Sequence, residues 1–130
     1  MAENPLATIK ALKEMGYEDF EFYGFDADKG LIYGYTPSEL KTILDDLQLS
    51  ITSGHYSFSP YLEKSDEALK HYVDQCILAA KAIDSKYITW PYIAPEQRTL
   101  DNFKLMSRKL NLIGEQVNEA GLGFAYHNHG

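Results

Sequence analysis

The chain has 130 residues, of which 45% are hydrophobic and 24% are charged. This balance is typical of one globular domain over residues 1–130, and no apolar run approaches the roughly 20 residues that a membrane-spanning helix needs. Nineteen acidic and twelve basic residues give a formal net charge of -7, without a Lys/Arg cluster. We therefore expect no nucleic-acid and no membrane partner. The amino-terminal residues lack the features of a secretion signal, so the expected location is cytoplasmic.

The first half of the chain alternates helix and strand patterns. Residues 4–16 predict a helix, with Asn4 at the N-cap, Pro5 at N1 and Gly16 as its stop. Residues 20–23 follow as a strand. The segment 36–39, Thr-Pro-Ser-Glu, is a capping box that opens a second helix. Residues 50–55 form the next predicted strand.

The second half repeats this order. A third helix begins near Ser65 and carries Cys76 on its apolar stripe, which predicts a buried core thiol. Residues 86–90 are the third strand. A fourth helix starts around residues 99–101 and ends at Gly121, and residues 123–129 form the last strand. The whole chain therefore reads as four helix-then-strand units.

The spacing of the strands indicates parallel pairing. Phe20, Ile51, Tyr87 and Phe124 mark the four strands at intervals of 31, 36 and 37 residues, with one amphipathic helix in each interval. Consecutive parallel strands joined by right-handed crossovers have this spacing. Strand order cannot be read from it, so an open doubly wound sheet and a barrel segment both remain possible.

The composition of the strands favours the barrel. Strands in an open parallel sheet are near-continuous apolar runs, whereas these strands alternate large apolar residues with small or polar ones. A (β/α)8 barrel needs eight strands and typically about 250 residues. We therefore predict an α/β fold that is a partial (β/α)8 TIM barrel, a half-barrel of four helix-strand units that looks cut at both ends.

Several phrases resemble the sugar phosphate isomerase/epimerase family, whose members are xylose isomerase-like TIM barrels. The most specific phrase is the last strand, Gly-Phe-Ala-Tyr-His-Asn-His-Gly over residues 123–130. Similar phrases are Gly16-Tyr17 followed by residues 20–22, then residues 53–55, then residues 87–91. The resemblance covers essentially the whole chain and would place it from helix 1 to strand 5 of such a barrel.

The resemblance implies an activity and a cofactor. Members of the family isomerise or epimerise a sugar through an enediolate, with a divalent metal at the carboxyl-terminal mouth whose ligands come from strands 5 to 8. The expected partner is a small-molecule sugar, and the expected cofactor is Mn²⁺, Zn²⁺, Co²⁺ or Mg²⁺. The proton-transferring carboxylates would lie outside these residues, so no catalytic residue is assigned. Whether this chain alone is an enzyme stays open.

His127 and His129 are the principal candidate site residues. They are two apart on one strand, so their side chains share a face and could both reach one ion or one polyol. We predict both as metal ligands and His129 also as a substrate contact. A His-x-His pair can equally be a surface or capping feature, and many relatives have a glutamate here instead.

Three further residues are predicted to contact the substrate. His55 ends its strand on the face of Ser53, where the alternative is an internally hydrogen-bonded histidine. Glu21 is a carboxylate within a strand and needs a partner, so a buried polar network is its alternative. Trp90 could form an apolar wall for a sugar ring, although aromatic residues at strand ends often serve only in packing.

Two other functions are compatible with the sequence. One is a catalytically inactive half-barrel that self-associates as a homo-oligomer, because exposed edge strands favour pairing. The other is a DNA-repair endonuclease, an activity found in the same superfamily, which the acidic charge and the absence of a basic groove disfavour.

Overall fold

Four parallel strands form the centre of the computed structural model, which describes residues 3–129; Gly130 lies outside them. The strands are β1 (Phe22–Tyr23), β4 (Ser53–His55), β5 (Tyr87–Trp90) and β6 (Gly123–Tyr126), and they pair in the order β1-β4-β5-β6. Neighbouring strands of this sheet are thus neighbours along the chain, as in a barrel wall. The prediction of half a TIM barrel is confirmed.

One helix leads into each of these strands. They are α1 (Pro5–Glu14), α2 (Pro37–Leu47), α3 (Asp66–Ala82) and α4 (Leu100–Glu119), with short 3-10 turns η1 (Ser59–Tyr61) and η2 (Pro95–Gln97) before α3 and α4. The predicted caps at Asn4 and Thr36 are present, and Ser65 and Thr99 cap α3 and α4 where these helices were expected to begin: all four side chains accept a hydrogen bond from a backbone N–H of the first turn. The helix starts were therefore encoded locally.

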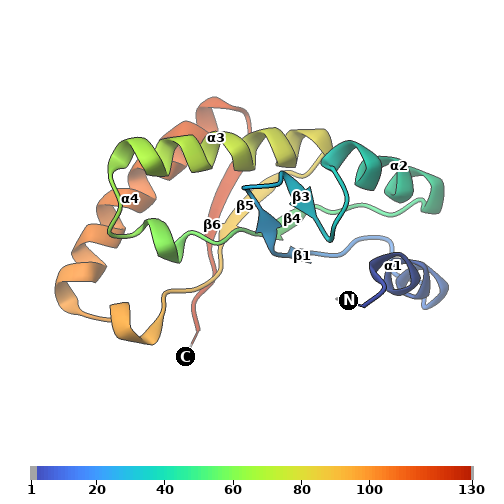
Figure 1. Ribbon diagram of the computed structural model, residues 1–130, viewed down its shortest axis with the longest axis horizontal. Helices are drawn as coiled ribbons and strands as arrows, with labels where there is room; N and C mark the ends of the chain where they lie inside the picture. The colour runs from blue at the N-terminus through green and yellow to red at the C-terminus, as the bar shows by residue number, and fades with distance from the viewer. Residues whose placement is uncertain (1–2, 130) are drawn as a thin grey trace.

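The helices cover one face of the sheet. Helix α3 packs between α2 and α4 and against β5, while α4 packs along β6. Figure 1 shows α3 running along the top of the strands, and both figures show α1 and α2 together at one end of the molecule. None of these helices is long and apolar enough to cross a membrane, as judged over residues 3–129.

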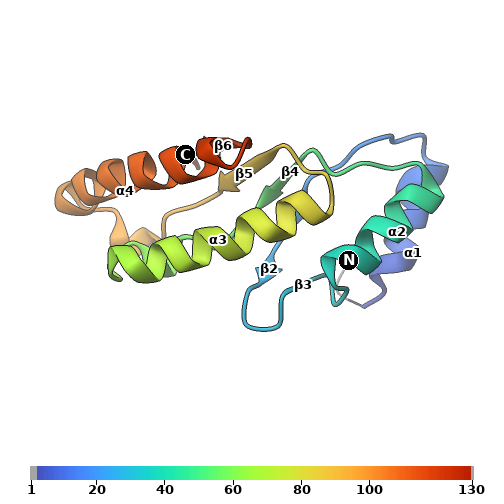
Figure 2. The ribbon, with the colours of Figure 1, turned by 90° about the horizontal axis from the view of Figure 1, so that it is seen from above.

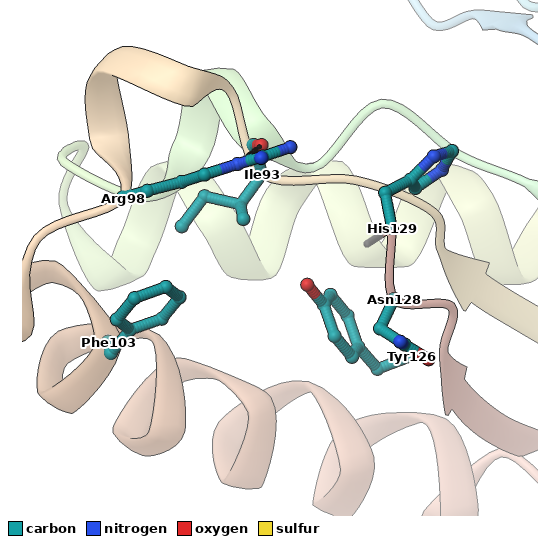
Figure 3. A pocket seen from close by; sticks show the side chains of 6 residues that line it. All are labelled: Ile93, Arg98, Phe103, Tyr126, Asn128 and His129. Carbon is teal, nitrogen blue, oxygen red and sulfur yellow. Dashed lines mark hydrogen bonds between the residues drawn. The ribbon is translucent and has the colours of Figure 1, made fainter.

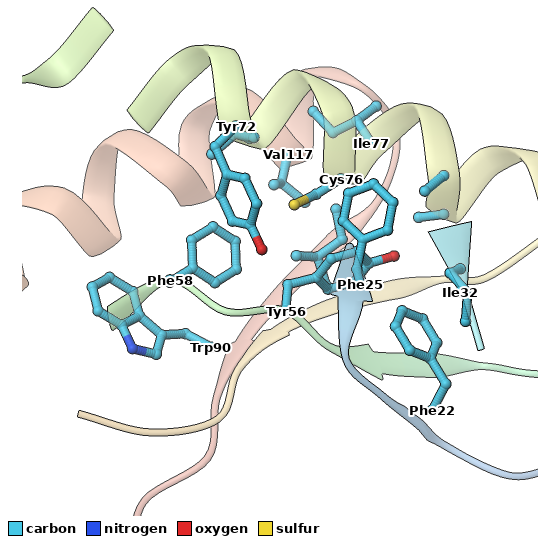
Figure 4. Packing of buried hydrophobic residues seen from close by; sticks show 14 of the residues in the cluster. Phe22, Phe25, Ile32, Tyr56, Phe58, Tyr72, Cys76, Ile77, Trp90 and Val117 are labelled. Atoms are coloured by element: carbon cyan, nitrogen blue, oxygen red, sulfur yellow. The ribbon is translucent and has the colours of Figure 1, made fainter. Parts of the chain in front are cut away.

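Large side chains fill the layer between sheet and helices. Phe22, Tyr56 and Phe58 are fully buried there together with the Cys76 thiol (Figure 4), so the prediction for Cys76 is confirmed. Gly54 makes room for this packing, because a Cβ at that position would lie 1.9 Å from the Phe22 ring. Burial raises the pKa of Cys76 well above its ordinary value, so its thiol stays protonated and inert.

A small antiparallel hairpin was not predicted. It consists of β2 (Phe25–Asp26) and β3 (Leu31–Ile32), joined by a turn in which the Asp26 carboxylate accepts from Lys29 N–H at 3.1 Å. Phe25 and Ile32 point into the core, and Gln75 of α3 donates to the Ala27 carbonyl at 3.1 Å. The hairpin thus closes the helix side of the sheet next to β1.

Candidate functional site

The site is built at the carboxyl-terminal ends of the strands, next to the face of the sheet that the helices do not cover. A pocket of about 680 Å³ lies there, lined by the last residues of strands and the segments that follow them: Tyr23, His55, Ser57, Phe58, Ser59, Pro60, Pro91, Tyr92, His127 and His129. In a (β/α)8 barrel this end of the strands is the mouth that carries the active site. The pocket therefore lies where a barrel enzyme would bind its substrate.

Glu21 and His55 form a paired group beside this pocket. The register of β1 and β4 places Glu21 next to Ser53 and Tyr23 next to His55. As a result the Glu21 carboxylate lies 3.1 Å from His55 Nε2 and accepts from the Ser53 hydroxyl at 2.6 Å. A carboxylate at Nε2 favours the proton on that nitrogen, which leaves Nδ1 as an acceptor.

The hydroxyl of Thr89 extends the network. It lies 3.0 Å from Ser53 Oγ, and because the single Ser53 hydrogen is donated to Glu21, Thr89 must be the donor in this contact. Three adjacent strands thus contribute to one chain of hydrogen bonds that ends on His55. Glu21 has the partners that its position required, and it does not line the pocket itself.

Three histidines converge at the pocket. The rings of His55 and His127 are stacked with centroids 5.5 Å apart, and the His129 ring stands edge-on to His127 at 4.8 Å. The His127 N–H donates to the Trp90 carbonyl at 2.9 Å, so the backbone pairing of β6 continues past its last strand residue. This continuation holds His127 on the same face as His55.

Aromatic side chains border the histidines. Tyr23 is 75% exposed, and its backbone N–H donates to the Tyr33 hydroxyl at 3.0 Å. Partial burial raises the pKa of Tyr33, so this phenol remains neutral at ordinary pH. On the other side the Tyr92 ring meets the His129 ring edge-on at 5.8 Å. The pocket therefore joins apolar ring faces to a few imidazole nitrogens, a combination typical of sites that bind small molecules.

Trp90 does not line the pocket. Its side chain is 0% exposed and stacks on Phe58 in the helix-side core, 5.4 Å between centroids. Its indole N–H donates to the Tyr92 carbonyl at 2.7 Å. The structure therefore gives Trp90 a packing role that fixes the loop carrying Tyr92, and no surface for a ligand.

Sequence reasoning missed the contribution of the loops. Ser57, Ser59 and Pro60 follow β4, and Tyr92 follows β5; the Ser59 hydroxyl donates to the Tyr92 carbonyl and ties the two loops together. The available signal was their position just after predicted strands, where parallel sheets bind ligands.

The described residues do not complete a metal site. Residues 3–129 contain no group of three or more His, Cys, Asp or Glu side chains arranged to hold an ion. His127 and His129 supply two imidazoles, and a firmly held divalent ion takes more ligands than that. Their metal role stays a prediction. The chemistry that the site shows by itself is hydrogen bonding by three imidazoles, one of them oriented by a carboxylate.

Comparison with known proteins identifies the fold. No family model matches the chain, and no curated protein matches it. Among solved structures, a sugar phosphate isomerase/epimerase from Parabacteroides distasonis ATCC 8503 is 24% identical with a TM-score of 0.81, over 98% of this chain and 46% of the other. The likeness to the family that the sequence indicated is confirmed at the level of structure.

Two more distant structures share this fold. A xylose isomerase-like TIM barrel protein from Mycobacterium smegmatis in complex with magnesium is 13% identical, with a TM-score of 0.67 over 96% of this chain and 48% of the other. An AP endonuclease, family 2, from Brucella melitensis is 12% identical, with a TM-score of 0.75 over 95% and 50%. The chain thus spans about half the length of the structures it matches. It has the fold of half a xylose isomerase-like TIM barrel, the fold of the sugar phosphate isomerase/epimerase proteins it resembles.

Proposed function

We propose that the chain forms part of the active site of a sugar isomerase or epimerase. The observation that carries the proposal is the convergence of His55, His127 and His129 on one pocket at the carboxyl-terminal ends of parallel strands. The acidic net charge of the chain favours a sugar over DNA as the ligand. The likeness to sugar phosphate isomerase/epimerase structures supports the same choice.

Each residue of the site receives a role in this proposal. The imidazoles of His127 and His129 bind substrate hydroxyls, and Tyr23 and Tyr92 provide flat apolar walls for the carbon skeleton. His55 presents Nδ1 as an acceptor because Glu21 holds the proton at Nε2. An acceptor of fixed orientation can take the proton of a substrate hydroxyl during conversion through an enediolate. Glu21 therefore acts through His55.

A divalent ion would complete the site only with further ligands. One relative with this fold is described in complex with magnesium. Since the described residues hold no three-ligand group, we propose that His127 and His129 contribute to such a site without forming it alone. When bound, a metal of this kind would polarise the substrate carbonyl as a Lewis acid.

The test is to incubate the protein with free and phosphorylated sugars in deuterium oxide, with Mg²⁺, Mn²⁺, Co²⁺ or Zn²⁺, and to follow them by NMR. We expect sugar-dependent shifts of the His55, His127 and His129 imidazole signals in this chain, and interconversion with deuterium incorporated next to the carbonyl in a protein that completes the barrel; His127→Ala should weaken the first and abolish the second. His71→Ala is the matched control, because His71 lies on the exposed side of α3. No conversion together with no sugar-dependent shift of any imidazole signal would refute the proposal.

Self-association is the second candidate. Within residues 3–129 the outer edges of β1 and β6 pair with no further strand, and Tyr23 and Tyr87 are 75% and 48% exposed on the uncovered face. Such edges and apolar faces favour pairing with a second copy. Sedimentation velocity over a concentration series tests this: a homo-oligomer is expected, and a monomer at all concentrations would remove the candidate.

A further inference from the structure

A second, smaller pocket lies next to the histidine pocket. Its volume is about 240 Å³, and it is lined by Ile93, Arg98, Phe103, Tyr126, Asn128 and His129 (Figure 3). These residues come from the loop after β5, the first turn of α4, the last residue of β6 and the segment that follows it. His129 borders both pockets, so a ligand in one would approach a ligand in the other.

Arg98 gives this pocket a positive charge that has no counter-ion in the part of the chain described. Its Nε donates to the Ile93 carbonyl at 3.2 Å, which fixes the plane of the guanidinium at the pocket wall. No carboxylate in residues 3–129 lies within ion-pair distance of it. Arg108 provides the contrast, since both of its terminal nitrogens bind Asp66, at 2.8 and 2.9 Å. The terminal N–H groups of Arg98 therefore remain available to a ligand.

The other polar groups of the pocket are neutral or potential donors. Figure 3 shows the Tyr126 hydroxyl directed toward the side of the pocket where Ile93 and Arg98 lie. Asn128 adds an amide and His129 an imidazole, and no Asp or Glu lines the pocket. One cation with several neutral donors and no carboxylate favours an anion locally, although the whole chain is acidic.

We propose that this pocket binds a phosphate group, and that the physiological ligand is a phosphorylated sugar whose carbon skeleton lies in the histidine pocket. The second half of this statement rests on the proposed function, whereas phosphate binding at Arg98 does not. Arg98 would bind two phosphate oxygens through its planar fork, and Tyr126 would donate to the phosphate group. The substrate class is thereby narrowed from sugars to sugar phosphates.

Titration of the protein with inorganic phosphate, followed by NMR of backbone amides and arginine side chains, tests the anion site without any turnover. We expect saturable shifts around Arg98 and Tyr126, and binding about tenfold weaker or more in Arg98→Ala. Arg108→Ala removes the same charge from α4, away from the pocket, and should leave the binding constant unchanged. Equal weakening in both variants, or shifts that do not saturate, would overturn the proposal.

One further variant and one further ligand test whether the pocket recognises phosphate through the Arg98 guanidinium. Arg98→Lys keeps the charge but loses the fork, so it should fold even if Arg98→Ala does not, and should still bind phosphate more weakly than the wild type. Acetate tests for a carboxylate ligand instead, and binding as tight as that of phosphate would refute the phosphate assignment. If phosphate binds as expected while no sugar is converted, only the proposed function fails.

Discussion

The two faces of the sheet differ in how tightly their side chains are packed, although residues of the two faces alternate along the same strands. On the helix-covered face Phe22 lies directly over Gly54, both buried, and a Cβ on Gly54 would come within 1.9 Å of its ring. On the uncovered face Tyr87 lies over Gly123 in the same way, with a corresponding distance of 2.5 Å, but Tyr87 is 48% exposed. The same aromatic-over-glycine pair is thus locked on one face and free to move on the other.

Because of this difference, the residues of a strand that face the helices should govern stability, and those on the uncovered face should govern binding. Side chains on the covered face are fixed by close packing, where an added methyl group has nowhere to go. Side chains on the uncovered face are fixed by hydrogen bonds, such as those from Ser53 and Thr89 toward Glu21. Changes on the first face should therefore unfold the protein, and changes on the second should alter what it binds.

Gly54→Ala should have the largest effect. With Phe22 buried among other rings, the added methyl forces the Phe22 ring out of its place in the core, and we expect the free energy of unfolding to fall by about 3 kcal/mol or more. Gly123→Ala is the matched control, because Tyr87 can rotate into solvent, and should cost less than about 1 kcal/mol. Urea denaturation followed by circular dichroism measures both; equal losses would contradict the distinction between the faces.

Lys109→Met should come next, because it tests a charge buried on the helix side. Lys109 is 1% exposed, and its ammonium donates to the carbonyls of Tyr61, at 2.8 Å, and of Lys64. Methionine fills the space but leaves both carbonyls unpaired, so we expect a loss of about 1–3 kcal/mol in the same denaturation experiment. A variant as stable as the wild type would show that water replaces the ammonium there.

The same lysine predicts a pH dependence. Desolvation lowers the pKa of Lys109 in the folded protein. Between this lowered value and its ordinary value of about 10.4 the unfolded chain binds more protons, so Lys109 makes the folded state more stable as the pH rises. The free energy of unfolding of the wild type, minus that of Lys109→Met, should therefore increase as the pH rises between these two pKa values. A constant difference would contradict the lowered pKa of Lys109.

Glu21→Gln should change function with little change in stability. The amide no longer holds the proton at His55 Nε2, so we expect turnover of a sugar substrate to fall roughly 10–100-fold, the usual range for a residue that orients a functional histidine. The ¹⁵N shifts of His55 should report a mixed tautomer. Glu119→Gln, at the exposed end of α4, is the control for lost charge. An unchanged tautomer would remove the positioning role.

Arg108→Ala should have the smallest effect. The Arg108 guanidinium lowers the pKa of Asp66, and the pair lies at the surface, where ion pairs contribute little. The contribution of Asp66 is present above its ordinary pKa and is lost as the pH falls through the lowered folded value. We expect a small drop in the thermal midpoint at neutral pH that disappears in acid. A drop as large as that of Lys109→Met would show that the exposed Arg108 contributes as much to stability as the buried Lys109.

Local chemistry explains which features could be predicted from the sequence. Helix caps require only nearby residues: the caps predicted at Asn4 and Thr36 were confirmed, and Ser65 and Thr99 cap the two helices whose starts were predicted there. The hairpin β2–β3 has strands of two residues each, too short for an alternating pattern, and its stability comes from packing against Tyr56 and α3. It could not be predicted without the fold.

The site shows the same limit. His55, His127 and His129 were predicted from their places at strand ends, and the register of the sheet does bring them together. Trp90 sits one residue beyond Thr89, on the opposite face, and a strand only four residues long gave too little pattern to assign its side. Arg98 was overlooked because its pocket forms only when the loop after β5 meets the end of β6.

The consecutive order of the strands also bears on how the chain acquires its structure. Each strand of the sheet pairs with the one formed just before it, so β4 adds to β1, β5 to β4 and β6 to β5. No strand inserts between two strands that come earlier in the sequence. The sheet can therefore grow at a single edge while the chain emerges from the ribosome, with each helix-strand unit using the previous one as its template.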